Sequence, residues 1–399
     1  MLRRLLPKPS GIRFSSTYAS KRLAKMEEIS AFPEHVQRDR LLSDLSIGDV
    51  AMRHHQISSS QKPIQMSHDQ FNQCIDAALL TFALHVESRT ASALGEGFYT
   101  IGPCGEETLA GVALALRPDD SVALHYRHLS TSLARGLQAG RSIEDLCMDR
   151  ARGYTVSSLD PIGGGAHCLL GGGKQDFLVT STLASQGPPA VGRALGGRLG
   201  HLLGGAAKEA SPFPSDFVSY VSTGDGSVNN AHFLSAVNLA EYTRHRGFKT
   251  PIVFGISDND RCISLRGYGW LDKFTTQRMG GMPVYRCDGN DVDAVYAATL
   301  EAAKFSRQRG APSAVVFESL SRRFGHAGEY SSKGERASRN GSTVDDIFIP
   351  PPSFKPVAMS LSQSPLSKTP KQVFFNPIIY ILTSFTHSCS TIINSTFFV

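Results

Sequence analysis

Hydrophobic and polar positions follow helical spacing in the first half of the chain. From Ser67 to Leu94, apolar residues recur about every three to four positions, which predicts an amphipathic helix with Asp69 near its start. Two further helical segments are predicted at 106–116 and 129–136, each ended by Pro, Gly or Asp. The pattern therefore predicts a series of helices in this part of the chain.

Strand-like patterns appear later in the chain. The runs 216–222 and 251–257 are apolar, β-branched and of strand length. The helix predicted between them has four apolar residues on one face: Phe233, Ala236, Val237 and Ala240. A strand, a helix and a strand in succession form a right-handed parallel unit, and a helix at 292–309 with a strand at 313–318 extends the same sheet. We therefore predict an α/β fold with a mostly parallel sheet flanked by helices.

Composition changes at both ends of this region. Residues 1–26 lack acidic residues and are rich in Arg, Leu and Ser, which is typical of a mitochondrial transit peptide and favours the matrix; a disordered basic arm is the alternative. We expect an extended arm over 27–66 and the main domain over 67–340. Residues 342–399 contain no glycine, so 341–399 is expected to be an atypical, disordered tail, whose apolar run is too short to span a bilayer.

Charge and cysteine content narrow the class of protein. The net charge is +6, but seven cations precede the first acidic residue, Glu27. The remainder is close to neutral, so no basic face is expected to attract nucleic acid. The 7 cysteines are scattered without a CxxC pair, which favours reduced thiols in the matrix or cytosol and no zinc site.

The most informative motif follows the first predicted strand. Gly224, Asp225 and Gly226 stand between that strand and a helix, where ligands bind in open parallel sheets. Asp225 offers a carboxylate to a divalent ion, and amides at the helix start can face a diphosphate. The next strand brings 258–260 to the same edge. A lone GDG is usually only a turn, but with Asn259 at the next strand end it predicts a magnesium site.

This combination resembles the thiamine-diphosphate motif of enzymes that decarboxylate 2-oxoacids, a GDG followed by a strand that ends in an asparagine pair. Five further segments resemble successive blocks of the alpha subunit of 2-oxoacid dehydrogenases, in the family's order: 97–120, 125–136, 181–192, 287–299 and 322–328. The resemblance implies a three-layer thiamine-diphosphate-binding fold. It also implies thiamine diphosphate and Mg²⁺ as cofactors.

The resemblance assigns the metal and diphosphate ligands to particular residues. Asp225, the side chain of Asn259 and the backbone oxygen of Arg261 would bind magnesium. Tyr126 and Arg127 would face the diphosphate, for which a guanidinium is a natural partner.

Other roles concern the thiamine ring and the substrate. Ser181 and Leu183 would reach the aminopyrimidine, with the leucine forcing the cofactor's bent shape. His326 is the candidate for steering a proton, and His167 could line the substrate cavity; for both, a histidine without function is the alternative. One departure from the family is SDND at 257–260, where Asp258 adds a negative charge near the diphosphate.

By resemblance, the chain would be the alpha subunit of an α2β2 heterotetramer. It would work with a beta subunit and a lipoyl acyltransferase core in the oxidative decarboxylation of a 2-oxoacid, with acyl transfer to lipoyl. The blocks at 181–192 and 287–299 resemble the branched-chain type more than the eukaryotic pyruvate type, which favours 3-methyl-2-oxobutanoate. Three alternatives remain: a catalytically inactive assembly or regulatory isoform, a pyruvate-type enzyme, and another thiamine-diphosphate enzyme such as a transketolase-like transferase.

Overall fold

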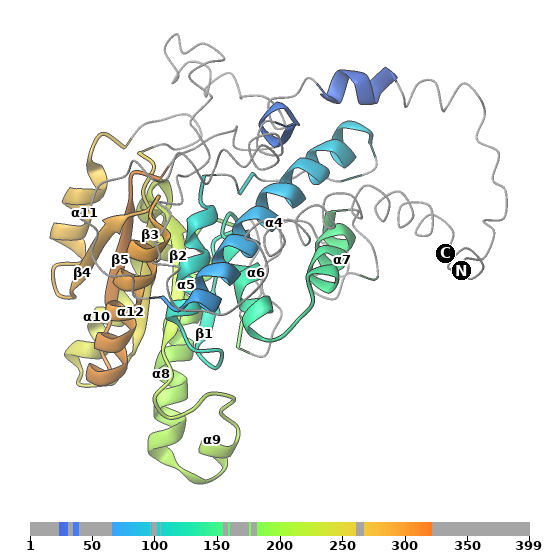
Figure 1. Cartoon of the computed structure of the whole chain (residues 1–399). Coiled ribbons are helices and arrows are strands. Elements are labelled where there is room, and N and C mark those ends of the chain that lie inside the picture. Colours follow the sequence, from blue (N-terminus) through green and yellow to red (C-terminus); the bar gives the residue numbers. More distant parts are fainter. Residues whose placement is uncertain are drawn as a thin grey trace, which may run out of the picture.

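One parallel sheet organises the chain (Figure 1). The computed structural model describes residues 24–30, 35–39, 66–95, 97, 102–103, 105–154, 159, 175–176, 182–260 and 267–320. Within them, five parallel strands pair in the order β1-β2-β3-β5-β4. These strands are β1 (Ser121–Ala123), β2 (Ser219–Gly224), β3 (Ile252–Ser257), β4 (Val284–Asp288) and β5 (Ser313–Glu318).

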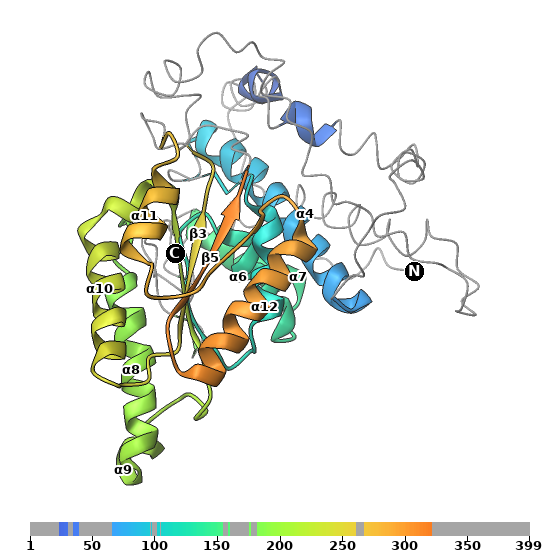
Figure 2. The ribbon, with the colours of Figure 1, turned by 90° about the vertical axis from the view of Figure 1, so that its left-hand side faces the viewer.

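Helices cover both faces of the sheet, as Figure 2 shows. One layer contains α4 (His68–Ala93), the 3-10 helix η2 (Glu107–Leu109), α5 (Ala110–Ala115), α6 (Leu129–Gln138), α7 (Ile143–Tyr154) and α12 (Val292–Arg309). The opposite layer contains α8 (Gly187–Leu203), α10 (Ala231–His245) and α11 (Trp270–Arg278). The predicted α/β fold, with a parallel sheet between two helical layers, is confirmed.

Strand residues alternate between two hydrophobic cores. Tyr220 and Val253 pack with α4, α5 and α12, whereas Val221 and Phe254 pack with α8 and α10. This alternation follows from the two-residue period of a strand. Because both faces are covered, β2, β3 and β5 are buried at nearly every position, including Ser219, Ser222 and Thr223 of β2.

Part of the predicted extended arm is helical instead. Residues 24–30 and 35–39 form helices, and Ile29 is completely buried. Nε2 of His35 lies 2.9 Å from Oγ1 of Thr90 in α4, so this contact joins the second helix to the domain. The predicted tail at 341–399 lies outside the described residues.

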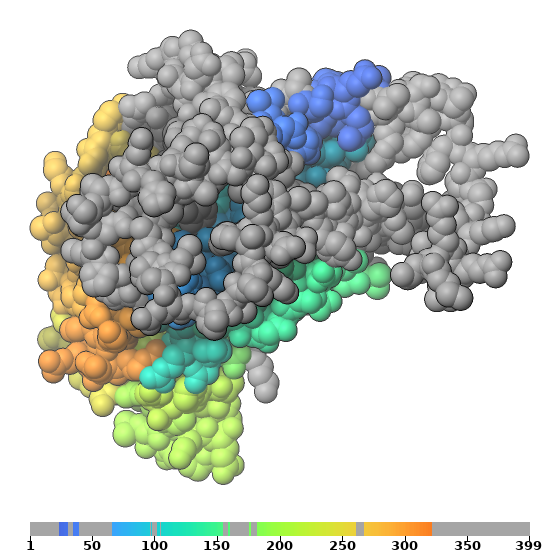
Figure 3. Space-filling model, in the orientation of Figure 1, coloured from blue at the N-terminus to red at the C-terminus, as the bar shows by residue number. Residues whose placement is uncertain are grey.

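Helix α8 extends beyond the sheet and is followed by α9 (Gly205–Glu209), and together they form the projection at the bottom of Figure 3. Leu202 and Leu203 at its tip are 80% and 75% exposed. Among the helices that the structure describes, none has the length and apolar character needed to cross a membrane.

Gly255 in β3 lies beneath the buried side chain of Tyr220 on the neighbouring strand. A Cβ atom at position 255 would overlap the Tyr220 hydroxyl. We therefore expect Gly255→Ala to destabilise the domain by about 1–3 kcal/mol, as overpacked cores do. Urea unfolding of the purified chain measures this loss of stability.

The matched variant is Gly192→Ala in α8. There the new Cβ meets no atom within 4 Å, so stability should rise by about 0.5–1 kcal/mol. Equal changes of stability in the two variants would contradict the predicted overlap between a side chain at position 255 and Tyr220.

Candidate active site

The GDG motif and the SDND motif meet at the carboxyl-terminal edge of the sheet. Gly224, the last residue of β2, is in register with Ser257, the last residue of β3. The chain then continues from β2 into the 3-10 helix η3 (Asp225–Asn229) and α10, whose N-cap Asn230 accepts a hydrogen bond from the N–H of His232. The sequence-based placement of Asp225 beside the next strand end is therefore confirmed.

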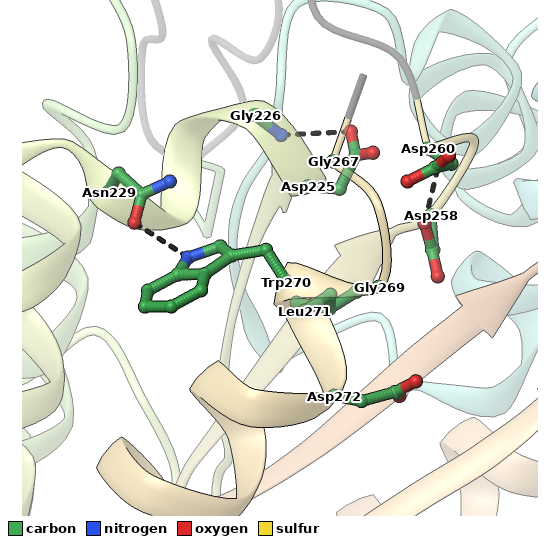
Figure 4. A pocket seen from close by; sticks show the side chains of 10 residues that line it. All are labelled: Asp225, Gly226, Asn229, Asp258, Asp260, Gly267, Gly269, Trp270, Leu271 and Asp272. Carbon is green, nitrogen blue, oxygen red and sulfur yellow. Dashed lines mark hydrogen bonds between the residues drawn. The ribbon is translucent and has the colours of Figure 1, made fainter. Parts of the chain in front are cut away.

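A hollow of about 330 Å³ lies between these two strand ends and the start of α11. Its lining residues, drawn in Figure 4, are Asp225, Gly226, Asn229, Asp258, Asp260, Gly267, Gly269, Trp270, Leu271 and Asp272. The side chains of Asp258 and Asp260 line it together, whereas Asn259 between them is not among the lining residues. The structure therefore places Asp260 in the same hollow as Asp225. The magnesium role that the resemblance implies for Asn259 stays a prediction.

Backbone hydrogen bonds hold Asp258 in place in the acidic lining of the hollow. Its N–H donates to the carbonyl of Phe317 (2.9 Å) and its carbonyl accepts from Leu320 (3.0 Å). Burial raises the pKa of its carboxyl group; the backbone N–H of Asp260 lowers it, and the nearby carboxylates of Asp260, Asp272 and Glu318 raise it further. A cation in the hollow would relieve this repulsion.

The wall of the hollow requires a close backbone approach at Gly267. A Cβ atom there would lie 2.8 Å from Oδ1 of Asp260, and the Gly267 N–H donates to the Asp260 carbonyl at 3.3 Å. Asp260 itself has a left-handed backbone, with φ of 52°. On the other side, Nε1 of Trp270 donates to Oδ1 of Asn229 at 2.8 Å and joins α11 to η3 (Figure 4).

The segment that follows β1 reaches the same edge. The His125 N–H donates to Oγ of Ser222 in β2 (2.9 Å), and the His125 ring lies 3.9 Å from the place of a Cβ atom on Gly224. Tyr126 and Arg127 follow directly, and Nη1 of Arg127 donates to the carbonyl of Gly102 at 2.5 Å. The structure therefore places His125 beside Gly224, and the two predicted diphosphate residues follow it directly in the chain.

A third segment reaches β2 through Gln186. Its Nε2 donates to the carbonyl of Ser222 at 2.8 Å, which holds the turn that carries Leu183. Leu183 is 40% exposed, and Ala184 next to it has a strained left-handed φ of 56°. Among the described residues, Oε1 of Gln186 and Oγ1 of Thr223 are buried without a hydrogen-bond partner.

Several predicted site residues cannot be placed. His167, Ser181, Arg261 and His326 lie outside the described residues, and their roles stay predictions.

Sequence analysis did not predict a cluster of three buried polar side chains near this edge of the sheet. Glu106, His125 and His128 each place one potential ligand atom within 4.8 Å of the others. Magnesium prefers oxygen ligands, whereas imidazole suits zinc, copper, iron and nickel. The carboxylates of Asp225, Asp258 and Asp260 therefore fit the predicted magnesium, and the histidine-containing group does not.

Comparison with known proteins places this arrangement in a family. Residues 80–333, well over half of the chain, match the family model described as dehydrogenase E1 component. The chain belongs to this family. The matched range includes the GDG motif, the segment after β1 and the strand end that carries Asp258 and Asp260.

The most similar relatives include alpha subunits of 2-oxoacid dehydrogenases. The 3-methyl-2-oxobutanoate dehydrogenase subunit alpha of Mycobacterium tuberculosis is 29% identical over 228 residues, which are 56% of this chain and 53% of that protein. The mitochondrial 2-oxoisovalerate dehydrogenase subunit alpha of Caenorhabditis elegans is 27% identical over 265 residues, 65% of this chain and 55% of that protein. A pyruvate dehydrogenase E1 component subunit alpha of Rhizobium meliloti is 26% identical, over 58% of this chain and 61% of that protein. The chain thus spans about half the length of the first two relatives.

Proposed function

We propose that this E1 family member is the alpha subunit of a 2-oxoacid dehydrogenase that uses thiamine diphosphate and Mg²⁺. One observation carries the proposal: the acidic hollow at Asp225, Asp258 and Asp260 lies at the sheet edge that also receives Tyr126 and Arg127. A divalent ion requires oxygen ligands, and a diphosphate requires cations and N–H donors. The carboxylates of the hollow and the guanidinium group of Arg127 support this proposal.

Different residues bind the metal, the diphosphate and the thiamine rings. Asp225 and the side chain of Asn259 hold magnesium, with the backbone oxygen of Arg261 as the further ligand that the resemblance implies. Asp258 and Asp260 add negative charge to the same hollow. Tyr126 and Arg127 hold the diphosphate, and Leu183 orients the thiamine rings. When bound, thiamine diphosphate supplies the carbon nucleophile for attack on the keto carbon of the substrate. His326 moves a proton, and His167 contacts the substrate.

The substrate that we propose is a branched-chain 2-oxoacid, 3-methyl-2-oxobutanoate first. Two of the relatives described above have names that refer to this class, and one has a name that refers to pyruvate. The proposed setting is an α2β2 heterotetramer with a beta subunit, which passes the acyl group to a lipoyl acyltransferase core. The basic leader supports a location in the mitochondrial matrix.

Reconstitution with a beta subunit tests the proposal. Thiamine diphosphate with Mg²⁺, at one hundred times its Kd, should stabilise the assembly by about 2.7 kcal/mol, and neither compound alone should do so. The assembly should release carbon dioxide from 3-methyl-2-oxobutanoate with a higher kcat/KM than from pyruvate. A preference for pyruvate would refute the substrate class alone. Binding of the beta subunit without cofactor binding or turnover would indicate an inactive assembly protein instead.

A further inference from the structure

The carboxylate of Glu106 is buried in a triangle of hydrogen bonds. Its Oε2 lies 2.9 Å from Nε2 of His128 and accepts a hydrogen bond from Oγ of Ser257 at 3.1 Å. Nε2 of His128 is also 2.8 Å from Oγ of Ser257. The side chains of His128 and Glu106 are 0% and 5% exposed, so water does not compete for these bonds.

Each corner of the triangle belongs to a different segment of the candidate active site. Ser257 ends β3 and directly precedes Asp258 in the acidic hollow. His128 directly follows Arg127 in the segment after β1. Glu106 lies 151 positions from Ser257 and directly precedes η2. One carboxylate therefore joins the metal-binding strand end to the diphosphate-binding segment.

The segment that carries Glu106 also holds the side chain of Arg127. The carbonyl of Gly102 accepts a hydrogen bond from Nη1 of Arg127, and the Glu106 N–H donates to Pro103 at 3.3 Å. The Glu106 carbonyl accepts a further bond from Oγ of Ser130, two residues beyond His128. Displacement of Glu106 would therefore disturb the backbone after Arg127. It would also disturb the Gly102 carbonyl, which accepts the hydrogen bond from the Arg127 guanidinium group.

The ionised form of Glu106 is maintained despite its burial. Burial raises the pKa of this carboxyl group, but the hydrogen bond from His128 and the charges of His128, His125 and Arg127 outweigh it and bring the pKa to about 2. Carboxylate acceptors make stronger and shorter hydrogen bonds than neutral ones, so the triangle is rigid near neutral pH.

We propose that Glu106 is a positioning residue for the cofactor site. Through His128 and Ser257 its carboxylate fixes Arg127 relative to the end of β3, so that the diphosphate and its metal meet a preformed site. This inference rests on the proposed function. A rigid arrangement matters because small displacements of binding groups cost affinity, and partners behind metal ligands commonly contribute 10- to 100-fold.

A buried carboxylate at the opposite edge of the sheet provides the matched control. Asp120 directly precedes β1, is completely buried, and pairs with Arg307 at 2.7 Å. Asp120→Asn removes one buried negative charge from an ion pair, as Glu106→Gln does, but at the amino-terminal edge. Comparison with Asp120→Asn therefore distinguishes a general loss of protein stability from a specific loss of cofactor binding.

The test measures the Kd of thiamine diphosphate at saturating Mg²⁺, by calorimetry on the full chain with its beta subunit. We expect Glu106→Gln and the milder Ser257→Ala to raise this Kd by about 10- to 100-fold, and Asp120→Asn to change it less than about twofold. The double variant should bind no more weakly than Glu106→Gln alone, because both changes break one network.

Three results would overturn the inference: a Kd for Glu106→Gln within twofold of the wild type, an equal rise in Asp120→Asn, or fully additive effects of Glu106→Gln and Ser257→Ala. Failure of the wild-type assembly itself to bind the cofactor would instead refute the proposed function, and this inference with it.

Discussion

Replacement of Asp225 by alanine is expected to reduce carbon dioxide release by the reconstituted assembly at least about 100-fold, because a magnesium ligand is lost. Asp225 lines the acidic hollow at the end of β2, and its Oδ1 accepts a hydrogen bond from the Gly226 N–H at 2.8 Å. Without this carboxylate, the metal that joins the diphosphate to the protein loses a charged ligand. The measurement is the rate of release of labelled carbon dioxide from a 2-oxoacid at increasing Mg²⁺.

A carboxylate at the other end of the same strand is the control. Asp216 precedes β2 and pairs with Arg117 at the surface, at a distance of 2.8 Å. Asp216→Ala makes the same change of charge but should leave the rate within about twofold, since an exposed pair contributes at most about 1 kcal/mol of stability. Equal losses in both variants would show that Asp225 acts through general stability.

Replacement of Asp120 by alanine is expected to lower the free energy of unfolding by about 3–5 kcal/mol, because it removes the carboxylate that pairs with the largely buried guanidinium group of Arg307. Oδ1 of Asp120 accepts from the Val218 N–H (2.8 Å) and from Nη1 of Arg307 (3.0 Å). Oδ2 accepts from the Arg117 N–H (2.8 Å) and from Nη2 of Arg307 (2.7 Å). One side chain thus joins the starts of β1 and β2 to α12.

Urea unfolding followed by circular dichroism measures this effect. Glu301→Ala on the same helix is the matched variant, since Glu301 pairs with Lys304 at 2.7 Å on the surface. It should cost no more than about 0.5 kcal/mol. A loss below about 1 kcal/mol in Asp120→Ala would contradict a stabilising role for the buried pair.

The elements that sequence predicts best have clear boundary signals. Helix α12 and strand β5 have the predicted bounds. The side chain of Asp291 caps the start of α12, and Gly310 ends it with a left-handed φ of 63°. Ser67 similarly begins α4 with a capping box. Local chemistry determines such ends, so they can be predicted without tertiary structure.

The elements that sequence analysis missed depend on tertiary contacts. Strand β1 is only three residues long, and β4 has no fully buried residue. Helix α8 contains Gly192, Gly196 and Gly200, which disfavour a helix by about 1 kcal/mol each. Burial of Ala190, Val191 and Ala194 against the sheet outweighs this penalty. Packing of this kind has no local pattern in the sequence.

The candidate active site likewise contains some features that sequence predicts and others that depend on tertiary contacts. The approach of Asp225 to the next strand end follows from parallel topology and was predicted correctly. Which of residues 258–260 line the hollow depends on the path of the chain after β3, which sequence alone does not specify. The magnesium role of Asn259 stays a prediction. The triangle at Glu106 was also missed, because its partners are 22 and 151 positions away.

The contact between Tyr220 and Gly255 limits how the two central strands can evolve. With a glycine on β3, the tyrosine ring can cross to the neighbouring strand, and any larger residue at 255 would overlap it. Substitutions at the two positions are therefore expected to occur together, a smaller side chain at 220 accompanying a larger one at 255. Such covariation would preserve the volume of the core below the active site while its composition drifts.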